Sequence, residues 1–332
     1  MSKSVLVVVA MASAMLLACM AAVLTATPGA SQTQTVTLVG AGDIAECSAD
    51  NNAEATAALL ANIPGSVLAL GDNAYPDGTR TQYANCYDNY RLSDGSVFDA
   101  RTYWWGQHKD RTMPVLGNHE YHASKVAQPY FDYFSALNGF LPPRAPVPNT
   151  PDNPGLTPGK GYYSYDRGSW HIVALNSNCN KVGGCEKTSA QGKWLRNNLA
   201  NSTNKQCTLA YFHHPLYSTG NNVTNPNVKP LWQILYNNGA EVIVNGHAHR
   251  YERYTPLTPG GKIDLQHGIR QIVAGTGGAP GGSEVQQAPG VKVVETGTSG
   301  VLKLDLSVGS YSWKFVHIEG QSFTDSGNGS CH

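Results

Sequence analysis

The sequence contains little charge and no excess of either sign. Only 14% of its 332 residues are Asp, Glu, Lys or Arg, and the 23 basic side chains balance the 23 acidic ones. Such a composition offers no basic stripe that could follow a nucleic-acid backbone or dock on an anionic membrane. If the substrate is anionic, its charge must be met by a few local groups or by a metal ion.

Three common signatures are also missing. No internal repeat is visible, and no Cys-x-x-Cys pair is present, which argues against a thiolate zinc site. The segment GTGGAPGG at 275–282 is rich in glycine, but it lacks the order GxGxxG and a following helix. Those two features define a nucleotide-binding loop, so we interpret the segment as a flexible turn.

A long apolar run stands at the N-terminus, where it follows Lys3, extends to about Leu24 and is succeeded by small residues. We predict a signal peptide over residues 1–30, cleaved at about Ala26 to Ala30, and therefore a secreted, extracellular protein without membrane contact. Two alternatives stay open. The run is about long enough for an uncleaved membrane anchor, and LLAC at 16–19 resembles a lipoprotein site that would leave a lipid on Cys19.

Six of the seven cysteines follow this segment, namely Cys47, Cys86, Cys179, Cys185, Cys207 and Cys331. An even number in an exported protein predicts disulfides, although six cysteines permit 15 pairings. Cys179 and Cys185 are close enough in the sequence to close a short loop, and this is the pair we predict first. The tripeptides NST at 201, NVT at 222 and NGS at 328 are glycan acceptors only in a host that glycosylates.

Short apolar runs rich in β-branched residues recur along the chain. They have the length of strands, and several are apolar throughout, as strands buried on both faces are. The runs are TVTLVG at 35–40, SVLALG at 66–71, TMPVLG at 112–117, WHIVALN at 170–176, TLAYF at 208–212 and EVIVNG at 241–246.

Helices are predicted between some of these runs, over residues 51–62, 189–200 and 229–239. Asn51 and Glu54 have capping-box spacing in the first helix, and Ser189 is the expected cap of the second. From about residue 270, three strand-like segments follow without helices, so the sheet is expected to finish antiparallel. The pattern predicts an α/β domain, with a long proline-rich surface loop at 141–161.

Five of the apolar runs are followed by side chains of the kinds that bind metals or move protons. In chain order these are Asp43; Asp72 and Tyr75; Asn118, His119 and Glu120; His213 and His214; His247 and His249. The ligand crevice of an open α/β sheet lies beyond the carboxyl ends of its strands, so these side chains are expected to meet at one edge. Taken singly, each motif has a simpler interpretation: GD as a turn, GNHE as a helix cap and HHP as a pre-proline loop.

Their recurrence at five strand ends favours a metal centre. Burying several unpartnered polar groups at one edge would cost on the order of a few kcal/mol each. Seven or eight ligands exceed what one ion can use, whereas two ions about 3.5–4 Å apart with a bridging carboxylate fit the set. His247 and His249 can then each face a different ion.

In this order, the motifs GD, GDNAY, GNHE, FHHPLY and GHAHRYER resemble those of the calcineurin-like metallophosphoesterase superfamily. The tyrosine of GDNAY together with GHAHRYER resembles the purple acid phosphatase branch, in a short single-domain form. The resemblance covers roughly residues 36–318 and implies two mixed β-sheets packed as a sandwich and flanked by helices. We expect a catalytic domain over residues 35–320 and a C-terminal tail over 321–332 tied by a disulfide.

The resemblance also implies a ligand set, in which Asp72 bridges the two ions. The first ion is bound by Asp43, Asp72, Tyr75 and His249. The second is bound by Asp72, Asn118, His213 and His247. A phenolate ligand favours a hard trivalent ion, so Fe3+ is expected at the Tyr75 site and divalent iron, zinc or manganese at the Asn118 site. His214 is left to contact the substrate.

We therefore predict a secreted phosphomonoesterase, similar to an acid phosphatase, that acts on phosphorylated small molecules. A metal-bound hydroxide attacks the phosphoryl group, and His119 protonates the leaving alkoxide as a general acid. Alternatively, His119 is a structural residue braced by Glu120, and Tyr75 packs over the crevice. Two other functions stay open: a phosphodiesterase or nucleotidase of the same fold, and a non-catalytic, metal-stabilised cell-surface binding protein.

Overall fold

The computed structural model of the chain describes residues 35–48, 51–88, 102–140, 143–202, 204–221 and 223–332. The predicted signal peptide and Cys19 lie outside these residues, as does part of each glycan acceptor at 201 and 222. Within the described part, no helix combines the length and the hydropathy that crossing a bilayer requires.

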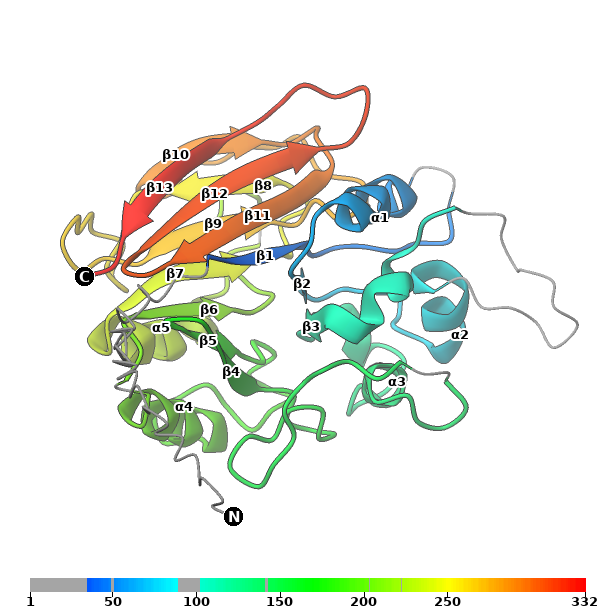
Figure 1. The fold of residues 1–332 in the computed structure, drawn as a ribbon, viewed down its shortest axis with the longest axis horizontal. Coiled ribbons are helices and arrows are strands. Elements are labelled where there is room, and N and C mark those ends of the chain that lie inside the picture. Colours follow the sequence, from blue (N-terminus) through cyan, green and yellow to red (C-terminus); the bar gives the residue numbers. More distant parts are fainter. Residues whose placement is uncertain (1–34, 49–50, 89–101, 141–142, 203, 222) are drawn as a thin grey trace, which may run out of the picture. The chain divides into compact units, whose positions relative to one another are not determined.

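The strands of the described chain form two mixed β-sheets (Figure 1), which confirms the predicted sandwich. The six-stranded sheet has the order β13-β12-β11-β1-β2-β3, and the seven-stranded sheet has the order β10-β8-β9-β7-β6-β5-β4. The first contains β1 (Val36–Ala41), β2 (Ser66–Ala69), β3 (Thr112–Pro114), β11 (Gly300–Ser307), β12 (Ser310–His317) and β13 (Ser326–Ser330). The second contains β4 (Tyr163–Arg167), β5 (Trp170–Ala174), β6 (Cys207–Tyr211), β7 (Ala240–Asn245), β8 (Tyr251–Tyr254), β9 (Arg270–Ala274) and β10 (Val291–Glu295).

Helices flank the two sheets. They are α1 (Ala53–Asn62), α2 (Arg80–Gln82), α3 (Gln128–Phe134), α4 (Ala190–Ala200) and α5 (Lys229–Asn237). Shorter helical turns are η1 (Tyr83–Tyr87), η2 (Trp105–Arg111), η3 (His119–Tyr121) and η4 (Pro226–Val228). Figure 1 shows α4 and α5 on one side of β4–β7, where Leu195 and Trp232 belong to the same buried apolar cluster as Ile243 of β7.

Burial along the strands explains the patterns of apolar residues in the sequence. β5 and β7 are buried along their whole length, because each lies inside a sheet that is covered on both faces. By contrast, β11 alternates buried and half-buried residues over its second half, and β12 alternates over much of its length. Both pair antiparallel with their neighbours, as predicted for the end of the chain. The first of the three predicted segments differs, because β9 lies in the other sheet and pairs parallel with β7 and antiparallel with β8.

The helix caps agree with the sequence at α4 and differ at α1. The Ser189 hydroxyl accepts the Gly192 N–H at 3.0 Å, as expected for a cap. The capping box predicted for Asn51 and Glu54 is wrong. The helix begins two residues later than expected, at Ala53, and Asn51 accepts the Ala53 N–H at 2.8 Å in a turn ahead of it. The Glu54 carboxylate instead accepts the Thr102 N–H at 2.9 Å.

Three disulfides join the six downstream cysteines: Cys47–Cys86, Cys179–Cys185 and Cys207–Cys331. The second confirms the pair predicted from spacing. The third ties the residue after β13 to the start of β6, so the last strand is linked to both sheets. Such bridges persist in oxidising compartments.

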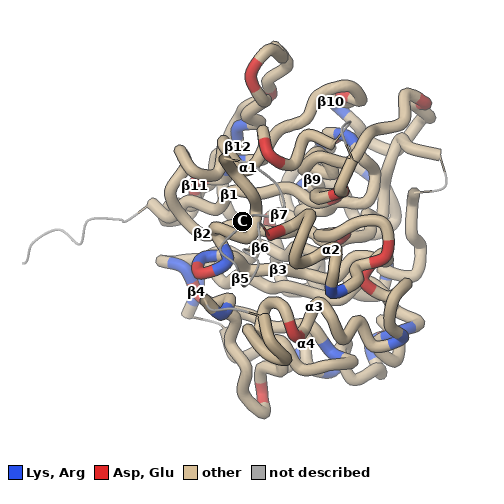
Figure 2. The backbone as a smooth tube through the Cα atoms, turned by 90° about the vertical axis from the view of Figure 1, so that its right-hand side faces the viewer, with Lys and Arg blue, Asp and Glu red and all other residues tan. Residues whose placement is uncertain are grey.

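The described part of the predicted proline-rich loop is a loop in the structure. Residues 143–161 contain no helix or strand. Figure 2 shows basic and acidic residues interspersed along the tube, with most positions carrying neither.

Candidate metal centre

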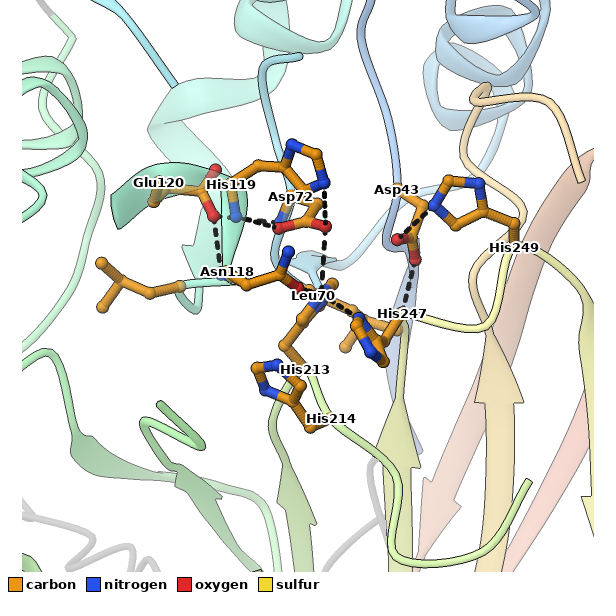
Figure 3. A network of polar contacts seen from close by, with 12 residues as sticks. Asp43, Leu70, Asp72, Asn118, His119, Glu120, His213, His214, His247 and His249 are labelled. Atoms are coloured by element: carbon orange, nitrogen blue, oxygen red, sulfur yellow. Dashed lines mark hydrogen bonds and ion pairs between the residues drawn. The ribbon is translucent and has the colours of Figure 1, made fainter. Parts of the chain in front are cut away.

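The predicted site residues come together where strands of the two sheets end. Asp43, Asp72 and Asn118 follow the parallel strands β1, β2 and β3, and His213 and His247 follow the parallel strands β6 and β7. Figure 3 shows these side chains converging from opposite sides. We name this group, with Tyr75 and His249, the strand-end cluster.

Glycines let the two sheets approach closely at this point. A Cβ added to Gly42 would lie 3.2 Å from the Gly246 Cα and 3.0 Å from the Leu70 carbonyl oxygen. Because side chains at these positions would push the strand ends apart, Gly42 and Gly246 set the width of the crevice that the polar residues share.

Unusual backbone conformations aim the side chains into the crevice. Asp43, Asp72, His247 and His249 have φ values of 60°, 49°, 70° and 31°. These are four of the seven non-glycine residues with positive φ in the described chain. Such conformations cost on the order of 1–3 kcal/mol each and gather at functional sites, where the surrounding structure maintains them. The cluster therefore concentrates strain that a structural core would avoid.

The Tyr75 hydroxyl faces more acceptors than it can serve. Its oxygen lies 3.0 Å from Asp43 Oδ1, 3.1 Å from Asp72 Oδ2 and 2.9 Å from His249 Nε2. His249 Nδ1 donates to the Pro280 carbonyl at 2.8 Å. Burial lowers the pKa of His249, but Asp43 outweighs it and raises the pKa to about 9, so without a cation Nε2 also carries a proton. A cation between these groups would displace the protons of the phenol and of Nε2 and would bind all four side chains.

The same excess of acceptors occurs around His213. Its Nδ1 donates to the Leu70 carbonyl at 2.8 Å. Its Nε2 lies 3.2 Å from Asp72 Oδ2, 3.2 Å from Asn118 Oδ1 and 3.2 Å from His247 Nδ1. Ligand atoms that bind one ion at about 2.0–2.2 Å are themselves about 3 Å apart. The oxygen and nitrogen ligands fit iron, zinc or manganese.

The two histidines of GHAH lie at different ends of the cluster. His249 faces Asp43 and Tyr75, whereas His247 faces His213. Potential ligand atoms of Asp43, Asp72 and His213 lie within 4.8 Å of one another, as do those of His213, His214 and His247. The residues present therefore fit two neighbouring cations.

Burial and neighbouring charges shift the pKa values of the imidazoles in opposite directions. Burial lowers the pKa of His213, but Asp72 outweighs this effect and raises the pKa to about 9. Burial lowers the pKa of His247 to about 4 and that of His214 well below its usual value. His247 and His214 are thus neutral with lone pairs available, whereas a cation at His213 has to displace a proton.

The carboxylates and the phenol respond to the same surroundings. Burial raises the pKa of Asp43, but His249 outweighs it and holds the pKa below the ordinary value. Burial raises the pKa of Tyr75 well above its usual value, and the two neighbouring carboxylates add to this shift. In the protein alone, Tyr75 is a neutral phenol beside two anions.

His119 lies at the mouth of the cluster. Its side chain is 26% exposed, and Nε2 lies 3.8 Å from Asp72 Oδ2. Nδ1 contacts the Pro76 carbonyl, and the ring lies 4.5 Å from the Tyr75 ring between centroids. The bracing by Glu120 that we considered from the sequence is wrong, because Pro76 holds the ring in its place.

Glu120 instead holds the backbone of the ligand loops. This fully buried carboxylate accepts N–H groups from Asp72 at 3.0 Å, Asn73 at 2.8 Å and Gly117 at 2.6 Å. The Tyr83 hydroxyl also donates to it at 3.0 Å. Glu120 therefore connects the loop after β2 to the loop after β3 through their backbone N–H groups (Figure 3).

His214 occupies the other flank of the cluster. Its ring lies 4.5 Å from the His247 ring between centroids. Its Nδ1 lies 2.8 Å from Ser177 Oγ, which also accepts the His214 backbone N–H at 3.0 Å. Ser177 fixes the imidazole and leaves Nε2 as the ring nitrogen available to a substrate.

Sequence analysis missed two supports of the cluster. Asn176 and Ser177 follow the apolar run of β5, so the signal that revealed the other five strand ends was present there too. Residues 275–282 form a turn without a following helix, as interpreted, but the turn is packed against the site. Gly275 is buried, and a Cβ there would lie 2.7 Å from Asp43 Oδ2, while the Pro280 carbonyl orients His249.

The family model of calcineurin-like phosphoesterases matches residues 36–251 of the chain. The chain belongs to this family. Two relatives of this phosphoesterase are purple acid phosphatases 15 and 13 of Arabidopsis thaliana. Number 15 is 24% identical over 221 residues, which are 61% of this chain and 38% of the plant protein. Number 13 is 25% identical over 225 residues, which are 59% of this chain and 38% of the plant protein. The match therefore spans well under half of either relative.

Solved structures share the fold of this purple acid phosphatase-like phosphoesterase. Purple acid phosphatase PPD1 from yellow lupin (Lupinus luteus) seeds has a TM-score of 0.62 at 16% identity, covering 90% of this chain and 54% of the lupin chain. GAP50 of Plasmodium has a TM-score of 0.59 at 13% identity, covering 88% of each chain.

Proposed function

We propose that this phosphoesterase is a secreted, dinuclear metal-dependent phosphomonoesterase. The observation that supports it most directly is the crowding of two carboxylates, a phenol, an amide and three imidazoles in the strand-end cluster. Their polar atoms lie 2.9–3.2 Å apart, the spacing of ligand atoms that share a cation. The proposal includes a cleaved signal peptide over residues 1–30, a catalytic domain over 35–320 and a tail over 321–332. The three disulfides support export to an oxidising compartment.

Asp43, Tyr75 and His249 would hold one cation, and Asn118, His213 and His247 the other, with Asp72 between them. Two bound cations neutralise phosphoryl charge and promote the ionisation of water. His119 is partly exposed at the mouth of the cluster and would donate a proton to the leaving oxygen. His214, oriented by Ser177, would donate a hydrogen bond from Nε2 to a phosphoryl oxygen.

Tyr75 supports ferric iron in the first position, because a phenolate with carboxylate neighbours is a hard ligand set. Divalent iron, zinc or manganese would occupy the second position. We expect purified protein to contain iron and to absorb visible light through phenolate-to-iron charge transfer, and Tyr75→Phe to lose this band while keeping metal. A colourless, fully active protein without iron would contradict the assignment.

A non-catalytic role has support among the relatives. One Arabidopsis thaliana protein, 28% identical over 104 residues, is named probable inactive purple acid phosphatase 9, and GAP50 is described as an anchor in the inner membrane complex. Such a protein could bind metal for stability and present its surface to a partner. In that case the protein would bind metal but would not hydrolyse phosphate esters.

Hydrolysis of nitrophenyl phosphate and bis-nitrophenyl phosphate separates these functions. We expect the wild type to hydrolyse the monoester, and Asp72→Asn to lose this activity because it removes the carboxylate shared by both positions. Hydrolysis chiefly of the diester would favour a phosphodiesterase or nucleotidase. Full metal content without hydrolysis of either ester would favour the binding protein.

A further inference from the structure

A cavity of about 380 Å3 opens beside the strand-end cluster. Asn118 and His214 form part of its wall, so it adjoins the flank of the cluster that faces His213 and His247. Its other walls include residues 177–181, in the loop after β5, and two asparagines at η4, of which Asn225 precedes the helical turn and Asn227 lies within it. A phosphoryl group held at the cluster would place the alcohol of the ester in this space.

The lining of the cavity is polar and carries positive charge. Among the described residues that form it, five are asparagines, one is a lysine, and none is an aspartate, a glutamate or an aliphatic residue. Asparagine amides both donate to and accept from hydroxyl and carboxylate oxygens. The ammonium group of Lys181 is a compact point charge that attracts anions. This chemistry matches an alcohol that bears hydroxyls and a second negative charge.

Lys181 stands on a loop with a well-defined backbone. The N–H groups of Lys181 and Val182 donate to the Asn178 carbonyl at 2.8 and 3.1 Å, and the Cys179–Cys185 disulfide closes the loop. The Asn178 amide donates to the Gly117 carbonyl at 3.2 Å, which ties this loop to the one that carries Asn118. A loop fixed in this way places a charge without a large ordering cost when a ligand binds.

The side chain of Lys181 extends toward the cavity. Its Nζ lies 5.9 Å from the centre of the Tyr121 ring, another lining residue. Lys187, six residues further along, lies outside this cavity and is exposed. The two lysines therefore form a matched pair in which one side chain faces the cavity and the other does not.

We propose that Lys181 determines substrate specificity, on the basis of the phosphomonoesterase activity proposed above. The cavity holds the alcohol of the ester, and Lys181 favours phosphomonoesters whose alcohol carries a carboxylate or a second phosphate. The amides bind the hydroxyls of that alcohol.

Two esters that differ in a single group test this proposal. 3-Phosphoglycerate carries a carboxylate where glycerol 3-phosphate carries a hydroxymethyl group. For the metal-loaded protein we expect a higher kcat/KM for 3-phosphoglycerate, and Lys181→Gln to lower the ratio of the two kcat/KM values about two- to five-fold, the range of an exposed ion pair. Lys187→Gln is the control, and the ratio is expected to stay at the wild-type value.

The outcomes separate this inference from the proposed function. If neither ester nor nitrophenyl phosphate is hydrolysed, the phosphomonoesterase proposal fails, and the inference fails with it. If nitrophenyl phosphate is hydrolysed but the ratio is equal in wild type and Lys181→Gln, only the inference is overturned. An equal decrease in Lys181→Gln and Lys187→Gln would also overturn it, because the effect would then be one of net charge. Raising the salt concentration should lower the wild-type ratio toward that of Lys181→Gln.

Discussion

Two groups of polar side chains in this fold are constructed in opposite ways. The first surrounds Asp325, just before β13. Its carboxylate accepts from the Tyr251 hydroxyl at 2.7 Å, from Arg253 Nε at 2.6 Å and from Trp313 Nε1 at 3.1 Å. One negative charge meets one positive charge, every acceptor has a donor, and none of these residues has a positive φ. We call this group the Asp325 cluster.

The strand-end cluster has the reverse properties. Its carboxylates stand on left-handed backbone, and around His213 Nε2 three acceptors share one proton. A group whose hydrogen bonds are complete stabilises the fold by itself. A group that is strained and short of protons is maintained by the surrounding structure for a ligand. The difference predicts that substitutions will separate stability from activity.

The largest effect on activity is expected at Asp43. Asp43→Asn keeps the size of the side chain, and asparagine tolerates the φ of 60° found there. The loss of an anionic ligand should lower kcat/KM for nitrophenyl phosphate by more than about 100-fold. Burial raises the pKa of Asp43, but His249 holds it below its ordinary value, so the ionised carboxylate contributes some stability at neutral pH. In the presence of a chelator, we expect urea unfolding to show a loss of no more than about 1 kcal/mol relative to the chelated wild type. A loss of more than about 2 kcal/mol in the chelated variant would show that the cluster stabilises itself, and the comparison would not hold.

Glu120 shares one property with each cluster. It supports the strand-end cluster, but its hydrogen bonds are complete, as they are in the Asp325 cluster. Glu120→Ala leaves three buried backbone N–H groups without a partner, and we expect it to cost about 3 kcal/mol of unfolding free energy. Displacement of the Asp72 and Gly117 backbone should also weaken metal binding about 10- to 100-fold. Urea unfolding and metal titration measure the two effects. The exposed Glu186→Ala is the control, and a Glu120 variant with wild-type metal affinity would place Glu120 in the fold alone.

The contrast between these residues shows how far the sequence predicts the site. Asp43, Asp72 and His213 were identified because each directly follows an apolar run, and the direction of a parallel strand fixes where its end lies. The α/β class and the late antiparallel strands followed from the same local patterns, whereas the two-sheet sandwich was predicted from the resemblance to metallophosphoesterases. Side chains that support the site, such as Glu120 and Ser177, also follow apolar runs, but the run does not show which groups they contact, because those contacts are set by packing. Glu120 bonds backbone 47 and 48 residues away, which sequence spacing does not reveal.

Close approach of the backbone is hidden for the same reason. Gly275 has no side chain to mark its position beside Asp43, and only the tertiary structure shows that a Cβ would collide there. Among the disulfides, Cys179–Cys185 was predictable from a separation of 6 residues. Cys207–Cys331 has a separation of 124 residues and depends on the docking of β13, which local sequence does not encode.

Asp325→Asn should have the opposite outcome to Asp43→Asn. We expect a loss of about 2 kcal/mol in unfolding free energy, because a charge-assisted network is weakened, with kcat/KM unchanged. Burial raises the pKa of Asp325, but hydrogen bonds from Arg253 and Tyr251 outweigh it and hold the pKa below its ordinary value of 3.8. The folded state therefore binds fewer protons than the unfolded state near pH 3.8.

The sign of this pKa shift predicts how the effect of Asp325→Asn depends on pH. The stability that Asp325 contributes is fully present above the unfolded pKa of about 3.8 and is lost as the pH falls toward the folded value. The difference between wild type and Asp325→Asn should thus be constant above about pH 5 and shrink below pH 4. Unfolding curves at a series of pH values measure it. If Asp325→Asn lowered kcat/KM as much as Asp43→Asn does, the proposed difference between the two clusters would be wrong.

The smallest combined effect on activity and stability is expected at Ser177. This variant tests whether a residue with complete hydrogen bonds also contributes to catalysis. Ser177→Ala removes the acceptor of the His214 backbone N–H and the partner of its Nδ1. The imidazole remains packed beside His247 but is free to rotate, so kcat/KM should fall about three- to ten-fold, with about 1 kcal/mol lost in stability. Ser177→Thr, which keeps the hydroxyl, should recover part of the activity.

Ser189→Ala is the matched control for this variant. It removes the cap of α4 and should cost a similar 1 kcal/mol or so without changing kcat/KM. Equal stability losses with unequal activity would show that Ser177 acts by orienting His214 and not by stabilising the fold. If both variants keep full activity, His214 needs no orientation by Ser177.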